Sequence, residues 1–188
     1  MILLAESANR TKQGGQELIG GLNVRVNRNH FGRQIESFQA ALDLPFLREA
    51  VADEKDFDTS RVPFKAIFIR APIVEKLLPS VNGAQEGEAQ VNDTIVAPSR
   101  ALAVGVDEKL SSAPVEVMAR LPGRIAAVSD EKIEKLDAEA GDIVAVRQGN
   151  VFGTSFHPEL TGDPRIHVWW LEQVSKAFDL NLRPMKSS

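Results

Sequence analysis

Cysteine is the residue type that this 188-residue sequence lacks altogether. Its absence excludes disulfides, thiolate metal sites and cysteine nucleophiles built from the chain's own residues. Histidine is scarce, and the three that are present (His30, His157 and His167) have neither metal-ligand spacing nor a carboxylate cluster beside them. The sequence therefore predicts neither a metal site nor a bound cofactor.

The sequence also lacks long apolar runs and has no surplus of basic residues. The net charge is −4 at pH 7 and the pI is near 5.5, so no cationic surface is predicted to neutralise the phosphates of a nucleic acid. The apolar runs are too short to span a bilayer, and the opening MILLAE lacks the basic flank of a signal peptide. We therefore expect no nucleic-acid partner, no membrane partner and a cytoplasmic location.

The composition is that of a globular protein. Apolar residues make up 43% of the chain and charged residues 26%, which together with the length predicts a single domain over 1–188. Two polar stretches, near 79–114 and 122–142, are predicted to be surface insertions. The first has no periodicity and is interpreted as an insertion or a mobile loop, and the second as a short helix or excursion. Apolar alternation or continuity predicts strands over 22–28, 36–46, 64–72, 114–121, 142–148 and 151–157, the last two joined by a turn at Gly149-Asn150.

The clearest element is a helix near the end of the sequence. Asp163 is a good N-cap and Pro164 suits the first helical position. The apolar residues that follow recur at three- and four-residue steps and form one stripe: Ile166, Trp169, Trp170, Val174, Ala177 and Phe178. Several strands and one strong helix predict an α/β domain.

The run VFGTSFHPEL, residues 151–160, carries the strongest chemical signal. Pro158 pushes the residue before it into an extended conformation, in which residues two apart point to the same face. His157 and Glu159 can therefore meet, as a histidine and an orienting carboxylate do beside an enzyme nucleophile. Taken alone, the same residues would more often be an exposed histidine beside a glutamate in a surface turn.

Four runs in the same order resemble one family. NRNHFGRQIESF, FIRAP, VRQGNVFGTSFHPELT and DPRIHVWWLEQV resemble the glutaminase subunit of pyridoxal 5′-phosphate synthase, a triad-type glutamine amidotransferase. The resemblance is collinear from Met1 to about Phe178, apart from the two polar stretches. It implies a partial flavodoxin-like fold, in which a mixed sheet is flanked by helices and the first strands of the sheet are missing.

The resemblance also implies where the nucleophile would be. Family members read Gly-Thr-Cys-Ala-Gly followed by an apolar helix similar to MILLAE, so Met1 falls just after that motif and Ser7 in the first helix. His157 would be the general base that activates the cysteine, and Glu159 the carboxylate that orients the histidine. The nucleophile itself is absent from the sequence.

Glutamine would be bound by three further residues that the resemblance identifies. Arg28, Ile69 and Arg70 match positions that contact glutamine in such relatives, and a guanidinium suits the α-carboxylate of the substrate. An isolated arginine is more often a solvated charge, but Arg70 ends an apolar strand, where ligand crevices of α/β sheets lie. The ammonia released from L-glutamine would pass to the synthase subunit in a hetero-oligomer.

Three hydroxyls are the candidate replacements for the missing thiol. Ser155 shares the predicted extended face of His157 but lies on the same strand, while Ser7 and Thr11 follow the position of the nucleophile, so none is favoured. We therefore expect a glutaminase-family chain that is inactive alone. The alternatives are a non-catalytic protein that binds or regulates the synthase, and a reading frame begun at an internal methionine.

Overall fold

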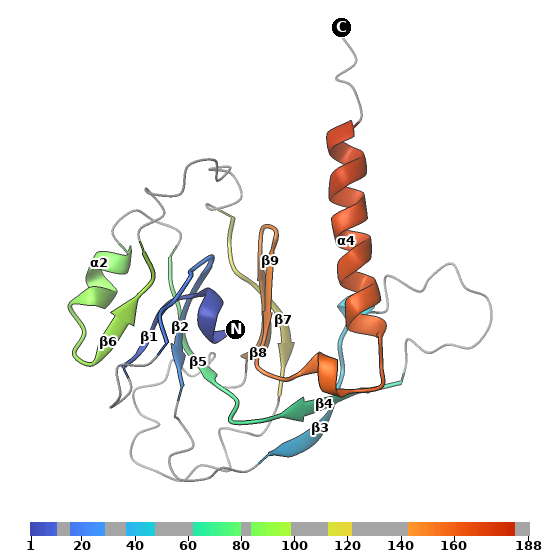
Figure 1. Cartoon of the computed structure of the whole chain (residues 1–188), viewed down its shortest axis with the longest axis horizontal. Coiled ribbons are helices and arrows are strands. Elements are labelled where there is room, and N and C mark those ends of the chain that lie inside the picture. The colour runs from blue at the N-terminus through green and yellow to red at the C-terminus, as the bar shows by residue number, and fades with distance from the viewer. Residues whose placement is uncertain are drawn as a thin grey trace, which may run out of the picture.

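The computed structural model describes residues 1–10, 16–28, 37–47, 62–79, 84–98, 113–121 and 143–182. Its helical elements are two 3₁₀ turns, η1 (Ile2–Leu4) and η6 (Pro158–Leu160), the short α2 (Ala84–Ala89) and the long α4 (Arg165–Leu182). Its strands are β1 (Ala5–Asn9), β2 (Leu22–Asn27), β3 (Phe38–Leu42), β4 (Phe64–Phe68), β5 (Ile73–Leu77), β6 (Thr94–Val96), β7 (Glu116–Arg120), β8 (Ile143–Gln148) and β9 (Val151–Thr154) (Figure 1). None of the described helices is long and apolar enough to cross a membrane.

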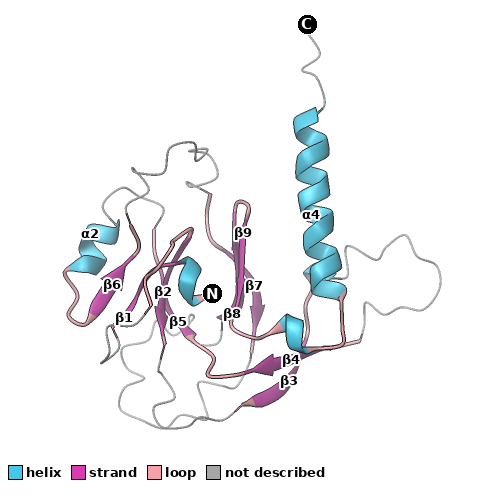
Figure 2. Ribbon diagram, in the orientation of Figure 1, coloured by secondary structure: helices cyan, strands magenta, loops and turns pink. Residues whose placement is uncertain are grey.

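The strands form three hydrogen-bonded sets (Figure 2). The first has the order β5-β2-β1-β6, in which β1 and β2 are parallel and both outer pairs are antiparallel. The second is the antiparallel pair β3-β4, and the third is the antiparallel set β7-β8-β9. The α/β class with a mixed sheet that the sequence predicts is confirmed.

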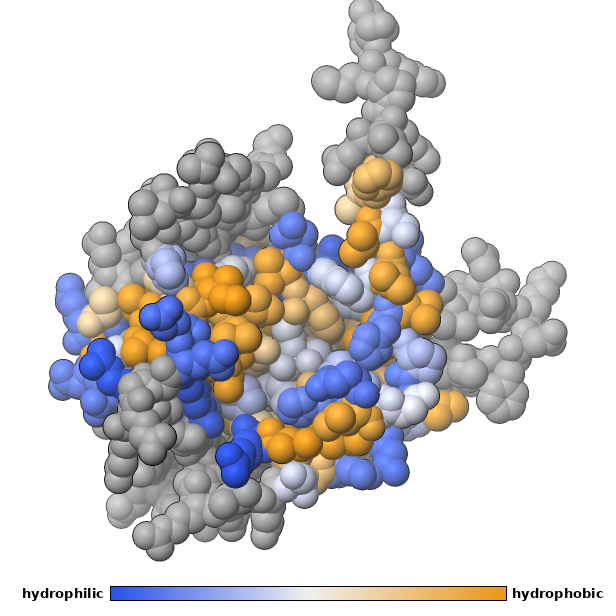
Figure 3. All heavy atoms as spheres, in the orientation of Figure 1, coloured by the Kyte–Doolittle hydropathy of each residue, from blue (hydrophilic) through white to orange (hydrophobic). Residues whose placement is uncertain are grey.

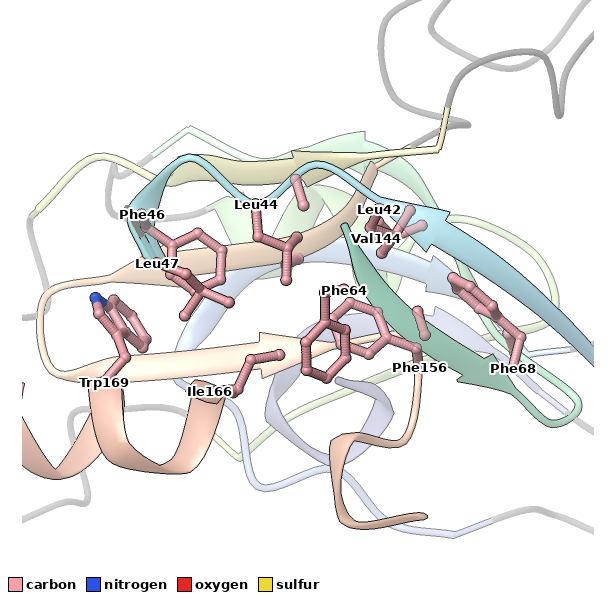
Figure 4. Packing of buried hydrophobic residues seen from close by; sticks show 14 residues of the cluster. Leu42, Leu44, Phe46, Leu47, Phe64, Phe68, Val144, Phe156, Ile166 and Trp169 are labelled. Atoms are coloured by element: carbon pink, nitrogen blue, oxygen red, sulfur yellow. The ribbon is translucent and has the colours of Figure 1, made fainter. Parts of the chain in front are cut away.

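Most of the buried apolar side chains fall into two clusters. One lies between β3, β4, β8 and the start of α4, and its largest members include Phe64, Phe68 and Trp169 (Figure 4). The other lies around β1 and β2 and includes Leu22 and Val26, which are fully buried. Full burial of one such side chain stabilises a fold by about 1.5–3 kcal/mol. The two clusters therefore stabilise the packing of the strands that carry the candidate site.

The predicted hairpin of β8 and β9 is confirmed. Gly149 and Asn150 form the turn, and Gly149 has φ +55, a conformation that glycine adopts without steric cost. The predicted strand 64–72 is too long, because β4 ends at Phe68 and the chain turns at Arg70, whose φ is +45. A new strand, β5, begins only at Ile73.

The prediction of an initial helix is wrong. Residues 2–4 form only the 3₁₀ turn η1, and Ser7 lies in β1 with no exposed surface. Strand β1 is paired on both sides, by β2 and by β6, and Ala5 and Ala8 are fully buried. Hydrogen bonds to two neighbouring strands thus override the local pattern of the sequence.

The interpretation of 79–114 as a mobile loop is wrong for residues 84–96. They form α2 and β6, and β6 pairs with the edge of β1 from Asn9↔Thr94 to Ser7↔Val96. The local pattern is polar because α2 is attached through Glu88, a buried charged residue, rather than through an apolar stripe. Whether this stretch is an insertion stays a prediction, and 122–142 lies outside the described residues.

The helix α4 keeps only the first part of its predicted apolar stripe in contact with the core. Ile166 and Trp169 are 3% and 4% exposed, whereas Val174 and Phe178 are 50% and 63% exposed. The helix leaves the body of the molecule along its length (Figure 1), and Figure 3 shows apolar residues along it on the visible face. The apolar stripe of α4 therefore extends beyond the part of the helix that packs against the described core.

Candidate functional site

The side chains of His157 and Glu159 meet, as the sequence predicts. Nδ1 of His157 lies 2.7 Å from Oε1 of Glu159. The backbone route differs from the expected one, because only His157 is extended, with φ −107 and ψ 91. Pro158 then opens the 3₁₀ turn η6, and this turn brings Glu159 back to the imidazole.

The contact fixes the chemistry of the two imidazole nitrogens. An ionised carboxylate can only accept hydrogen bonds, so Nδ1 carries the proton that faces Glu159. In the neutral imidazole, Nε2 is then the nitrogen with a free lone pair, as a general base needs. The hydrogen bond from His157 lowers the pKa of the Glu159 carboxyl below its ordinary value. The side chains are 40% and 57% exposed, so a small substrate can reach them.

Backbone contacts place His157 between two strands. The N–H of His157 donates to the carbonyl of Ile67 on β4 over 2.8 Å, and the N–H of Ser155 donates to the carbonyl of Val144 on β8 over 2.8 Å. The hydroxyl of Thr154, at the end of β9, donates to the carbonyl of Phe156 over 2.8 Å. The candidate base is therefore fixed at the place where β4 and the β8-β9 hairpin come together.

The residues after η6 connect it to α4. The predicted capping contact of Asp163 is present, since its Oδ1 accepts from the N–H of Arg165 over 3.1 Å, but the helix begins at Arg165 and not at Pro164. The guanidinium of Arg165 is bonded to Asp163, which lowers the pKa of that carboxyl, and also donates to the carbonyl of Val62 over 2.9 Å. The hydroxyl of Thr161 donates to the carbonyl of Pro158 over 2.9 Å. Sequence reasoning missed Thr161 and the Ile67 contact.

Two of the predicted glutamine-binding residues lie on the turn that follows β4. Ile69 and Arg70 come two and three residues after the Ile67 carbonyl that His157 contacts, and both are exposed. Arg70 has φ +45, a left-handed conformation that costs a non-glycine residue about 1–2 kcal/mol. Strain of this kind is concentrated at functional sites.

The third predicted binding residue, Arg28, leaves the sheet at the same end. Asn27, the last residue of β2, is paired with Ile73, the first residue of β5. Arg28 and the turn at Arg70 therefore lie beyond the same end of these two strands. Nη2 of Arg28 donates to the carbonyl of Gln16 over 2.7 Å. Its Nε is buried and has no hydrogen-bond partner in the described part of the chain, and burial lowers the pKa of the guanidinium.

Neither described candidate for a replacement nucleophile is suited to the role. Ser155 does not share the exposed face of His157: it is 3% exposed, and its hydroxyl is 3.3 Å from Sδ of Met1. Ser7 has no exposed surface and donates to Glu88 over 2.8 Å. Thr11 lies outside the described residues. Across the described ranges, no three His, Cys, Asp or Glu side chains are grouped so as to hold a metal ion.

Comparisons with known proteins agree on one family. The model of the SNO glutamine amidotransferase family matches residues 1–107 and 106–176. The probable pyridoxal 5′-phosphate synthase subunit PDX2 of Arabidopsis thaliana is 33% identical over 176 residues, which are 94% of this chain and 55% of the relative. The pyridoxal 5′-phosphate synthase subunit PdxT of Rhodococcus opacus is 36% identical over 174 residues, 93% of this chain and 57% of the relative.

The chain spans about half the length of the curated relatives it matches. Among solved structures, one titled a crystal structure of glutamine amidotransferase has 30% sequence identity and a TM-score of 0.48. That match covers 93% of this chain and 56% of the other.

Proposed function

The chain belongs to the SNO glutamine amidotransferase family, and we propose that it provides the general base and the substrate-binding residues of a glutaminase subunit. The reaction is the hydrolysis of L-glutamine to glutamate and ammonia, and a cytoplasmic pyridoxal 5′-phosphate synthase subunit is the acceptor of the ammonia. The observation that carries the proposal is the contact of His157 with Glu159, 2.7 Å long and open to solvent.

The chemistry requires a thiol in addition to this pair. Nε2 of His157 takes the thiol proton, the thiolate attacks the side-chain amide carbon of glutamine, and the imidazolium returns the proton to the departing nitrogen as ammonia leaves. Water, deprotonated by the same imidazole, then hydrolyses the thioester to glutamate and the free thiol. Glu159 keeps Nδ1 protonated throughout and stabilises the imidazolium.

The substrate is recognised by charge at the end of β4 and β2. We assign the guanidinium of Arg28, which follows the end of β2, and that of Arg70, on an exposed turn after β4, as the cations that bind the α-carboxylate of glutamine. The Ile67 carbonyl links this turn directly to His157.

Binding of L-glutamine to the 188-residue chain tests the recognition step without any turnover. We expect amide resonances of Ile69, Arg70 and His157 to shift in NMR titrations with L-glutamine. Arg70→Ala should weaken binding about tenfold or more, because a charge-assisted hydrogen bond is lost. Lys65→Ala removes an exposed cation from β4 itself and is the matched control, which should bind as the wild type does. Equal weakening by both variants would contradict the assignment.

Turnover tests the catalytic role. Because the sequence contains no cysteine, we expect the chain mixed with a synthase subunit to release ammonia from glutamine only at the background rate. A chimera supplies the thiol: a segment of a family member that ends in Gly-Thr-Cys-Ala-Gly, the nucleophile motif that the resemblance implies, is joined ahead of Met1. This chimera should release ammonia, and its cysteine-to-alanine variant should not.

The lack of cysteine favours one alternative, a non-catalytic protein that binds or regulates the synthase subunit. Sedimentation of the chain with the synthase subunit distinguishes the two. A stable complex together with a chimera that remains inactive favours the alternative. The absence of any complex excludes it.

A further inference from the structure

The turn that carries Glu159 has little to fix it apart from hydrogen bonds. None of the residues of η6 is buried, and the side chains of Glu159 and Leu160 are both more than half exposed. The turn therefore lacks the apolar anchor that holds β9 before it and α4 after it. Its conformation depends on the few polar contacts that close it.

Thr161, the residue that follows η6, makes several of these contacts. Its N–H and its hydroxyl both donate to the carbonyl of Pro158, over 3.2 and 2.9 Å. The other backbone bond of the turn, from the N–H of Leu160 to the carbonyl of His157, is longer at 3.3 Å. The hydroxyl thus makes the shortest hydrogen bond that closes the turn.

The same hydroxyl connects the turn to a rigid element. Its oxygen lies 3.3 Å from the backbone N–H of Asp163, which donates to it, and 3.3 Å from the Asp163 carbonyl. Asp163 caps α4 and is bonded to Arg165, which reaches the carbonyl of Val62 beside β4. Movement of the Pro158 carbonyl is therefore restrained by the capped start of α4.

We propose that Thr161 is a positioning residue for the His157–Glu159 pair. Its hydroxyl holds the carbonyl of Pro158, which fixes the peptide that leads into Glu159 and keeps the carboxylate within hydrogen-bond distance of Nδ1. The catalytic meaning of this role rests on the proposed function, but the geometry does not. The test therefore uses the free 188-residue chain, without glutamine or synthase.

Thr161→Val removes the hydroxyl and keeps the shape of the side chain, whereas Thr161→Ser keeps the hydroxyl. The readout is the titration of the Glu159 carboxyl by ¹³C NMR, since the bond from His157 lowers the pKa of that carboxyl. We expect its midpoint to rise towards that of an ordinary glutamate in Thr161→Val and to remain as in the wild type in Thr161→Ser. The Nδ1 proton resonance of His157 should broaden or disappear in Thr161→Val alone, as its exchange with water becomes faster.

A distant threonine provides the control. Thr94 on β6 accepts a hydrogen bond from Arg25, so Thr94→Val also removes a buried hydroxyl but should leave the Glu159 midpoint unchanged. An unchanged midpoint in a folded Thr161→Val would overturn the proposal. So would the unfolding of both Thr161→Val and Thr161→Ala, because the hydroxyl would then support the whole fold. Failure of glutamine hydrolysis in the chimera, with these shifts observed, would contradict only the proposed function.

Discussion

Replacing Glu88 by glutamine tests the polar network that attaches α2 to the first sheet. The Glu88 side chain is 7% exposed, and its Oε2 accepts from Nη1 of Arg25 over 2.9 Å and from the hydroxyl of Ser7 over 2.8 Å. Nζ of Lys76 lies 3.6 Å from the other carboxylate oxygen. Arg25 has a second partner, Glu75, at 2.8 Å.

The size of the effect follows from what glutamine keeps. Its amide oxygen can still accept one hydrogen bond, but the charge that strengthens the bonds from Arg25 and Lys76 is lost. Breaking a buried ion pair outright destabilises by about 3–5 kcal/mol, and a hydrogen bond to a charged group contributes about 1.5–3 kcal/mol. Because Glu75 still pairs with Arg25, we expect Glu88→Gln to lower the free energy of unfolding by about 1.5–3 kcal/mol at pH 7.

The effect should depend on pH in a definite direction. Burial by itself raises the pKa of Glu88, but the hydrogen bonds from Arg25 and Ser7 and the charges of Arg25 and Lys76 outweigh it, so the pKa is lowered. The unfolded chain then binds this proton more readily than the folded one. The contribution of Glu88 is present above the ordinary glutamate pKa and is lost as pH falls through the lowered value.

Urea unfolding followed by circular dichroism, at pH 7 and at a series of acidic pH values, measures the difference. The gap in unfolding free energy between the wild type and Glu88→Gln should be largest near neutrality and shrink in acid. Glu17→Gln changes an exposed glutamate and should stay within about 0.5 kcal/mol of the wild type. The reasoning is refuted if Glu88→Gln matches Glu17→Gln at pH 7, or if its gap widens in acid.

Two further predictions concern packing and backbone conformation, and the same urea unfolding measures both. Trp169 is 4% exposed, and the centroid of its ring lies 4.6 Å from that of Phe46. Trp169→Ala should therefore lower the free energy of unfolding by about 3–5 kcal/mol. Leu171→Ala, at a position 64% exposed on the same helix, should lower it by no more than about 0.5 kcal/mol. Equal losses would contradict the packing of α4 on the core through Trp169. Gly149 has φ +55 in the β8-β9 turn, so Gly149→Ala should cost about 1–2 kcal/mol, and an unchanged midpoint would contradict that conformation.

The elements that sequence reasoning predicted well are those whose signal is local. Alternation in 22–28 gave β2, the Gly149-Asn150 dipeptide gave the hairpin turn, and Asp163 before Pro164 gave the cap of α4. The elements it missed depend on partners far away in the sequence. Strand β6 is stabilised by its pairing with β1, and no alternation of apolar residues within 79–114 indicates that pairing.

In the candidate site, too, the contacts predicted from the sequence are local, and the missed ones join distant segments or lack a distinctive pattern. The contact of His157 with Glu159 follows from their spacing around Pro158, although a 3₁₀ turn rather than a strand produces it. The bond from His157 to Ile67 joins segments that are far apart in the chain, so no local pattern indicates it. Thr161 follows the motif directly, and a hydroxyl after a short turn is too common a pattern to be identified without the geometry.

Ammonia release from L-glutamine by the chimera, in the presence of the synthase subunit, tests most directly whether His157 is the general base. The account predicts release that requires the supplied cysteine and that falls by about 10²-fold or more in the His157→Ala variant of the chimera. Cysteine-dependent release at the same rate with and without His157 would contradict it.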